Sequence, residues 1–281
     1  MAIRILTDST SDILPQEAQE RGIVVVPLRV TFGEESFRDN VDITHEEFYQ
    51  KLAGVEKLPT TSQPTPEDFL THFEQAKEQG DTLICILLSG GLSGTFQSAQ
   101  IAKELCDYEN IYVIDSRQAT AGIRILVDLA ALLIEEGKSA QEIVAEVEAA
   151  RERVRLYIMV DTLEYLHKGG RLSSSVAVVG TMLKVKPLIA LKDGVLDMAG
   201  KGMGSKDAMK KLMGLVGEEL HSDPRMPVHF VYTAKESNCV QLRTLAEEKY
   251  GVQKAESHSV GAVLGAHVGP GAAAIAYLEQ E

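Results

Sequence analysis

The chain has 281 residues and a formal net charge of −13, and hydrophobic residues make up 44% of it. This length suggests one large or two medium domains with an ordinary core, while the negative charge argues against non-specific binding to nucleic acid or to an anionic membrane surface. Three well-separated cysteines, no signal-peptide pattern and no apolar run of about 20 residues predict a reduced, cytoplasmic protein without disulfides or membrane insertion.

Short aliphatic runs alternate with amphipathic segments in the first half of the chain. The expected strands span residues 3–7, 23–30, 82–88 and 111–114. The expected helices begin near residues 44, 65, 95, 119 and 139, and the last of them runs to about 154. Capping boxes at Thr44–Glu47 and Ser139–Glu142, and Pro66 directly after Thr65, support three of these starts. Such alternation predicts a parallel sheet with helices on both faces.

The pattern changes after about residue 155. The expected strands there span residues 157–160, 187–191, 195–199, 227–233, 255–260 and 271–278. Asp193-Gly194 between two of them is a strong hairpin signal, and helices are expected over 176–183 and 237–250. The sequence therefore predicts an N-terminal α/β domain over 1–155 and a C-terminal α+β domain with a mixed or antiparallel sheet over 156–281.

A glycine-rich stretch, Leu88-Ser-Gly-Gly-Leu-Ser-Gly-Thr95, follows the most aliphatic of these strands and leads into a helix. Backbone N–H groups and hydroxyls gather at such a strand tip, which makes it a natural anion site. It has no lysine and is not a P-loop, and it lacks the dinucleotide fingerprint. The alternative is a tight turn that simply needs small residues.

Two further segments carry candidate polar ligands. Pro59-Thr-Thr-Ser-Gln-Pro64 holds three hydroxyls between prolines that stiffen the loop. His267 lies in a glycine- and alanine-rich segment that would let a ligand approach the imidazole, and a histidine with a hydroxyl can hold a carboxylate. A packed or capping histidine is the commoner outcome. No cysteine or second histidine stands near it at metal-ligand spacing, so no metal site is expected.

Acidic residues at two strand ends support a different hypothesis. Asp8, Asp12 and Asp115 could hold Mg²⁺ in a phosphotransferase or phosphatase. The favoured alternative is that the segment Ser9–Asp12 only caps the next turn. Lys168-Gly-Gly-Arg171 could hold phosphate, but such a segment is more often a solvated helix end.

Six segments match one known family in order along the chain. They are Thr7-Asp-Ser-Thr-Ser-Asp12, Thr61-Ser-Gln-Pro64, Leu88-Ser-Gly-Gly-Leu-Ser-Gly-Thr95, Val113-Ile-Asp-Ser116, Leu163-Glu-Tyr-Leu-His-Lys-Gly-Gly-Arg-Leu172 and Gly265-Ala-His-Val-Gly-Pro-Gly271. The chain therefore resembles the DegV family over essentially its whole length.

The resemblance implies a protein that holds one long-chain fatty acid, such as palmitate, between two domains, without a cofactor, a metal or catalysis of its own. It implies that Thr61 and Ser93 bond the carboxylate and that Ser62, the Gly94 backbone N–H and His267 complete the clamp. It also implies an ATP-using fatty acid kinase subunit as partner, whose acyl phosphate feeds phospholipid synthesis. The acyl tunnel is expected along the apolar helix, at Val176, Val179, Met182 and Leu183.

One position departs from the family pattern. Many relatives carry Gly-Lys-x-Arg where this chain has Gly200-Lys-Gly-Met203, which bears on the kinase partnership and not on lipid binding. The residues and the resemblance together leave three hypotheses: a lipid-presenting protein, a Mg²⁺-dependent enzyme, and a regulatory module that senses lipid and binds another protein.

Overall fold

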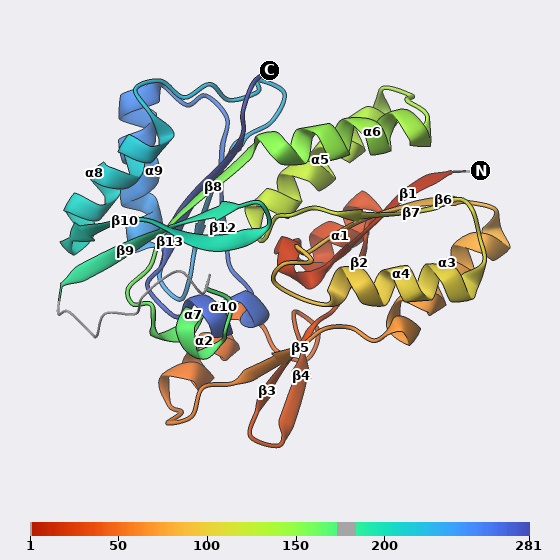
Figure 1. Cartoon of the computed structure of the whole chain (residues 1–281), viewed down its shortest axis with the longest axis horizontal. Coiled ribbons are helices and arrows are strands. Elements are labelled where there is room, and N and C mark those ends of the chain that lie inside the picture. The colour runs from red at the N-terminus through yellow and green to blue at the C-terminus, as the bar shows by residue number, and fades with distance from the viewer. Residues whose placement is uncertain (1, 173–183) are drawn as a thin grey trace.

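The computed structural model describes residues 2–172 and 184–281 (Figure 1). The strands of these residues are β1 (Ile3–Asp8), β2 (Val24–Val26), β3 (Arg29–Phe32), β4 (Glu35–Arg38), β5 (Thr60–Ser62), β6 (Thr82–Leu87), β7 (Ile111–Asp115), β8 (Val154–Met159), β9 (Val185–Lys192), β10 (Val195–Met203), β11 (Val228–Tyr232), β12 (Ala255–Ser259) and β13 (Ala273–Leu278). The helices are α1 (Pro15–Arg21), α2 (His45–Ala53), α3 (Pro66–Gln79), α4 (Thr95–Cys106), α5 (Ala121–Glu135), α6 (Ala140–Ala150), α7 (Glu164–Lys168), α8 (Gly204–Val216), α9 (Ser237–Tyr250) and α10 (Ala262–Val268), with short 3₁₀ turns η1 (Ser9–Ser11) and η2 (Arg151–Arg153).

The first sheet is parallel, with strand order β2-β1-β6-β7. Every residue of β6 is buried, as expected for a strand covered on both faces. Alternate residues of β6 face opposite sides: Cys85 packs with α3 and α4, whereas Ile84 packs with α5. The predicted parallel sheet with helices on both faces is confirmed.

The second sheet has six strands in the order β10-β9-β8-β13-β11-β12, and only the β11–β12 pair is parallel. Helices α8 and α9 cover one face through Met209, Leu212 and Leu242. The β9–β10 hairpin turns at Asp193 and Gly194, which both have positive φ, and this matches the predicted two-residue turn. The expected mixed sheet with helices is therefore present.

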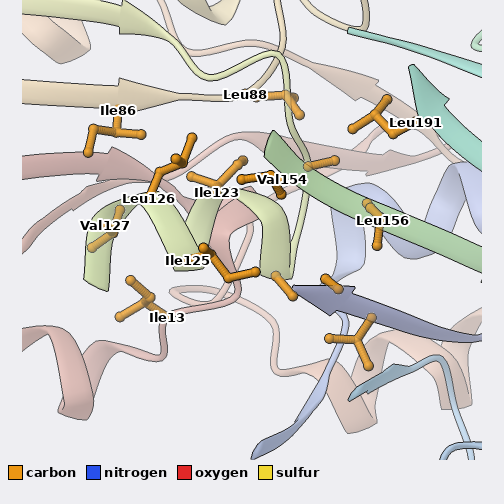
Figure 2. Packing of buried hydrophobic residues seen from close by; sticks show 14 of the residues in the cluster. Ile13, Ile86, Leu88, Ile123, Ile125, Leu126, Val127, Val154, Leu156 and Leu191 are labelled. Carbon is orange, nitrogen blue, oxygen red and sulfur yellow. The ribbon is translucent and has the colours of Figure 1, made fainter. Parts of the chain in front are cut away.

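Helix α5 joins the two sheets into one core. It is apolar almost all round, and Ile123, Ile125, Leu126 and Val127 are completely buried, as expected for a helix enclosed on every side. Figure 2 shows these side chains between residues of the first sheet and those of β8. The predicted boundary near residue 155 lies at the start of β8, and hydrophobic packing continues across it.

Some sequence predictions were wrong in detail. The run 23–30 is two strands, because Pro27 lacks an N–H and separates β2 from β3. Strand β3 belongs to a three-stranded antiparallel sheet, β4-β3-β5, which the sequence did not predict. Helix α6 ends at Ala150 instead of near residue 154. The helix predicted over 176–183 lies outside the described residues.

Candidate functional site

A cavity of about 390 Å³ lies where the carboxyl end of β6 meets the six-stranded sheet and α10. This is the end of a parallel sheet where ligands usually bind, and the volume falls within the roughly 300–1,000 Å³ of ligand pockets. Most of the lining side chains are aliphatic: Leu28, Leu88, Leu92, Ala119, Leu156, Ile158, Leu166, Leu196, Val231, Val260, Val263, Leu264, Val268, Ala272, Ala273 and Ala274.

The polar end of the cavity is formed by residues from distant parts of the chain. Thr61 lies on β5 and pairs with Val30 of β3, while His267 lies in the last turn of α10. The Thr61 Oγ1 and His267 Nε2 atoms are 2.7 Å apart. Both side chains line the cavity, together with Ser62 and Ser93. The fold thus brings together four of the five residues predicted to hold a carboxylate.

The His267 ring is packed tightly on its other side. A Cβ atom at Gly169 would lie 2.2 Å from His267 Nδ1, so only glycine allows this approach. Burial, assisted by the nearby Arg171 charge, lowers the pKa of His267 to about 4. The imidazole is therefore neutral at neutral pH, and Nδ1 has no hydrogen-bond partner among the described residues.

The fifth predicted residue, Gly94, lies at the N-terminal end of α4 and has no side-chain cap. Its neighbour Ser93 bonds Thr95 Oγ1 at 2.9 Å. Gln63 covers Gly94, since a Cβ atom there would lie 2.2 Å from Gln63 Oε1, and Gln63 Nε2 donates to Ser98 at 3.0 Å. The hydroxyl-rich strand β5 is therefore held against the first turn of α4, where N–H groups lack helical partners.

Arg171 also lines the cavity, and the sequence did not assign it to the site. Its Nε donates to the Leu92 carbonyl at 3.2 Å and its Nη1 donates to the Gly169 carbonyl at 2.6 Å. The sequence favours a solvated helix end for this segment; helix α7 does end at Lys168, but Arg171 lines the cavity. The signal that could have identified it was its place within the matched segment Leu163–Leu172.

A second, more polar hollow of about 600 Å³ shares Thr61, Arg171 and His267 with the first. Lys57 and Lys168 also line it. The polar end of the aliphatic cavity is therefore flanked by three cationic side chains and one acidic side chain, Glu56. Lys168 is paired with Glu164 at 2.7 Å, and the remaining positive charge favours an anion there.

The three carboxylates of the enzyme hypothesis, Asp8, Asp12 and Asp115, accept hydrogen bonds from backbone N–H groups. Asp8 accepts hydrogen bonds from the N–H groups of Thr10 and Leu88, and Asp12 accepts one from Gly261 N–H at 2.8 Å. Asp115 accepts hydrogen bonds from two N–H groups of neighbouring turns. Within residues 2–172 and 184–281 these three carboxylates form no cluster that could hold a metal ion. The capping alternative holds for Ser11, whose Oγ accepts from Ile13 N–H at 3.5 Å, whereas Ser9 and Asp12 accept from the distant Leu28 and Gly261 N–H groups.

Two other predicted features are not among the described residues that line the cavity. Val176, Val179, Met182 and Leu183 fall outside the described residues, so their expected place in an acyl tunnel stays a prediction. Met203 ends β10 with its side chain exposed, and its N–H donates to Asp207 at 2.7 Å. In the described part of the chain no helix has both the length and the apolar character needed to cross a membrane.

Comparison with known proteins supports the resemblance. A DegV domain-containing protein from Caldanaerobacter subterraneus is 36% identical over 99% of both chains. A solved structure from Thermus thermophilus, described as fatty acid binding of a DegV family protein, has 34% identity, a TM-score of 0.89 and full coverage of both chains. A stearic acid-binding protein from Eubacterium ventriosum has 29% identity and a TM-score of 0.88, covering 99% of this chain and 98% of its own.

The family model described as "Uncharacterised protein, DegV family" matches residues 2–280, nearly the whole chain. Together with the full-length relatives above 30% identity and the shared fold, this match is decisive. The chain belongs to the DegV family.

Proposed function

We propose that this protein binds one long-chain fatty acid in the aliphatic cavity and presents its carboxylate to a separate ATP-using kinase subunit. The observation that carries the proposal is the pairing of Thr61 with His267 at the polar end of that cavity. Solved relatives described as binding fatty acids, including stearic acid, share this fold.

Aliphatic burial supplies the affinity. Each CH₂ group transferred from water contributes about 0.8 kcal/mol. A sixteen-carbon tail would contribute on the order of 10 kcal/mol before ordering costs. Side chains such as Leu156, Val231 and Val263 from three different elements suit a narrow, flexible chain, because they offer apolar contact on all sides.

The carboxylate needs donors once it leaves water. We assign this role to the hydroxyls of Thr61, Ser62 and Ser93 and to the Gly94 N–H, with His267 as their partner. Arg171 adds a positive charge at the same end of the cavity. Charge-assisted hydrogen bonds of this kind are roughly twice as strong as neutral ones.

Presentation to a kinase is supported by the second hollow. Lys57, Lys168 and Arg171 flank the place where the carboxylate would lie, and these cations would favour the phosphate groups of a nucleotide brought by a partner. No carboxylate is among the described residues that line the aliphatic cavity, so it offers no aspartate or glutamate to act as a general base.

Native mass spectrometry of the purified protein tests the lipid proposal. We expect one fatty acid per chain, released as free acid on extraction, and a chain that takes up no long-chain acid would refute the proposal.

A second experiment tests the kinase role. Without a partner, the protein loaded with ¹⁴C-palmitate and supplied with Mg-ATP should form no acyl phosphate. Formation of acyl phosphate by the isolated chain would instead make it an enzyme.

A further inference from the structure

Three potential metal ligands meet on the edge of the six-stranded sheet, away from the lipid cavity. In the parallel pair β11–β12, His229 lies opposite Glu256, and His258 follows two residues later. Residues opposite each other in register and residues two apart share a face of the sheet. His229 Nδ1 lies 3.2 Å from His258 Nε2, which lies 3.2 Å from Glu256 Oε2.

These spacings fit the edges of a metal coordination tetrahedron. Zn²⁺ binds histidine nitrogen at about 2.0–2.1 Å and carboxylate oxygen at about 2.0–2.2 Å. Because the edge of a tetrahedron is roughly 1.6 times the centre-to-corner distance, neighbouring ligand atoms should lie about 3.3 Å apart. One ligand atom from each of the three residues lies within 4.8 Å of the others, so only small side-chain movements are needed.

The Asp128 carboxylate lies next to the second ring nitrogen of His229, the most buried of the three proposed ligands. His229 is completely buried, and its Nε2 atom has no hydrogen-bond partner among the described residues. That atom faces Asp128 Oδ2 of α5 at 3.9 Å, while Arg21 holds the other Asp128 oxygen. Histidine ligands usually donate their second ring N–H to a carboxylate, which fixes the tautomer and the ring orientation.

We propose that His229, His258 and Glu256 bind one divalent transition-metal ion, best matched by Zn²⁺, with a fourth position open to water. Asp128 would act as a positioning residue through His229. Two histidines with one carboxylate and a water form a common zinc ligand set. The positive charge of Arg124 lies near these ligands and would repel a cation, but its guanidinium is paired with the Glu17 carboxylate.

Metal binding would displace a proton from this cluster, since His258 Nε2 now lies within hydrogen-bond distance of both His229 Nδ1 and Glu256 Oε2. A bound ion would fasten the edge strand β12 to β11, whose last residues Val231 and Tyr232 line the aliphatic cavity.

Titration of the untagged, metal-free full-length chain with Co²⁺ and Zn²⁺ tests this site. We expect one ion per chain, with the intense visible absorption of four-coordinate Co²⁺, and a rise in melting temperature with Zn²⁺. His258→Gln and Glu256→Gln alter the partly exposed edge strand and should weaken binding at least 100-fold, since second-shell losses alone cost about 10–100-fold. Asp128→Asn should weaken binding about 10–100-fold with the Co²⁺ spectrum retained.

His221→Gln is the matched control. His221 lies 3.7 Å from Glu219 on the exposed surface, so it is a histidine–glutamate pair outside the proposed site. This variant should bind the ion like the wild type. The proposal is overturned if the wild type binds no ion with micromolar or tighter affinity, or if His258→Gln and Glu256→Gln bind as well as His221→Gln.

Discussion

Thr61 Oγ1 and His267 Nε2 lie 2.7 Å apart although 206 positions separate them in the chain. The contact depends on α10, whose start is held by two buried carboxylates, Asp12 after β1 of the first sheet and Asp39 after β4 of the three-stranded sheet. Asp12 accepts a hydrogen bond from Gly261 N–H and Asp39 accepts one from Ala262 N–H, at the start of that helix. The strand-tip acids therefore position the histidine that completes the polar end of the cavity.

Replacing Thr61 by valine keeps the side-chain shape and removes the hydroxyl. A hydrogen bond to a charged group contributes about 1.5–3 kcal/mol, so we expect fatty acid affinity to fall about 10–100-fold. Fluorescent fatty acid displacement would measure the change.

Thr31→Val is the control for this variant, because Thr31 lies on the neighbouring strand β3 and outside both hollows. It should bind as the wild type does. Equal affinities for the two variants would remove Thr61 from the site.

Gly94 should not accept a side chain. A methyl group there would displace Gln63 from Gly94 and from Ser98, which disturbs the hydroxyl strand. We expect Gly94→Ala to weaken fatty acid binding more than it weakens folding, because the atoms it would displace are at the end of the flexible Gln63 side chain.

Gly214→Ala is the control. Gly214 in α8 has open space, so this variant should stabilise the protein by about 0.5–1 kcal/mol with unchanged binding. Isothermal titration with thermal unfolding separates the two effects, and equal binding by both variants would count against this role of Gly94.

Arg171 should discriminate an acid from a neutral lipid. Arg171→Gln removes the charge near Thr61 and His267 while keeping a polar side chain. Palmitate affinity should fall about tenfold or more, whereas the affinity for hexadecanol should change little. Parallel losses for both lipids would mean that Arg171 acts only through packing.

Protonation of Asp12 makes the stability of the folded chain depend on pH. Burial raises the pKa of Asp12 to about 8 from its ordinary 3.8, so the folded chain keeps this proton to a higher pH than the unfolded chain. Its contribution to stability is full at pH below about 4 and is lost as the pH rises toward 8. Asp12→Asn, which keeps an acceptor for Gly261 N–H, should therefore gain stability relative to the wild type between pH 5 and 8.5 in urea unfolding. Asp12→Ala should cost about 1–3 kcal/mol at pH 5, and this cost should shrink by pH 8.5 because alanine also lacks the titrating proton.

The contribution of His267 to stability changes with pH in the opposite direction to that of Asp12. Its pKa of about 4 lies below the ordinary 6.5, so the unfolded chain takes up this proton first. Its contribution to stability is full above pH 6.5 and falls as the pH drops toward 4, by at most about 1.4 kcal/mol per pH unit. A bound carboxylate favours the imidazolium, so fatty acid should reduce this slope between pH 7 and 5. Lipid-free His267→Gln should show a shallower slope than the lipid-free wild type, and identical slopes would contradict the assignment.

The sequence predicted those parts of the fold that local chemistry decides. The capping boxes at Thr44 and Ser139 form as expected, and Thr65 caps α3 before Pro66. The fully aliphatic run of β6 is a buried parallel strand. Each of these signals depends on residues within one turn or one strand, which is why it can be recognised without coordinates.

The remaining features depend on contacts between distant segments. Helix α10 has only seven residues, too few to show a hydrophobic period, and strand β5 has only three. Arg171 is held at the cavity by hydrogen bonds to the carbonyls of Leu92 and Gly169, and Leu92 is 79 positions away in the chain. Hydroxyl-rich segments could be proposed as ligands from the sequence and the family resemblance, but their meeting with His267 depends on the packing of α10 against β3 and α2.

A crystal structure of the complex with a long-chain acid brominated at its tail tests the central claim most directly. We predict the carboxylate within hydrogen-bond distance of Thr61 and Ser93, and anomalous density for the bromine among the aliphatic side chains that line the cavity. An empty cavity, or a lipid whose head group lies away from Thr61 and His267, would contradict the account.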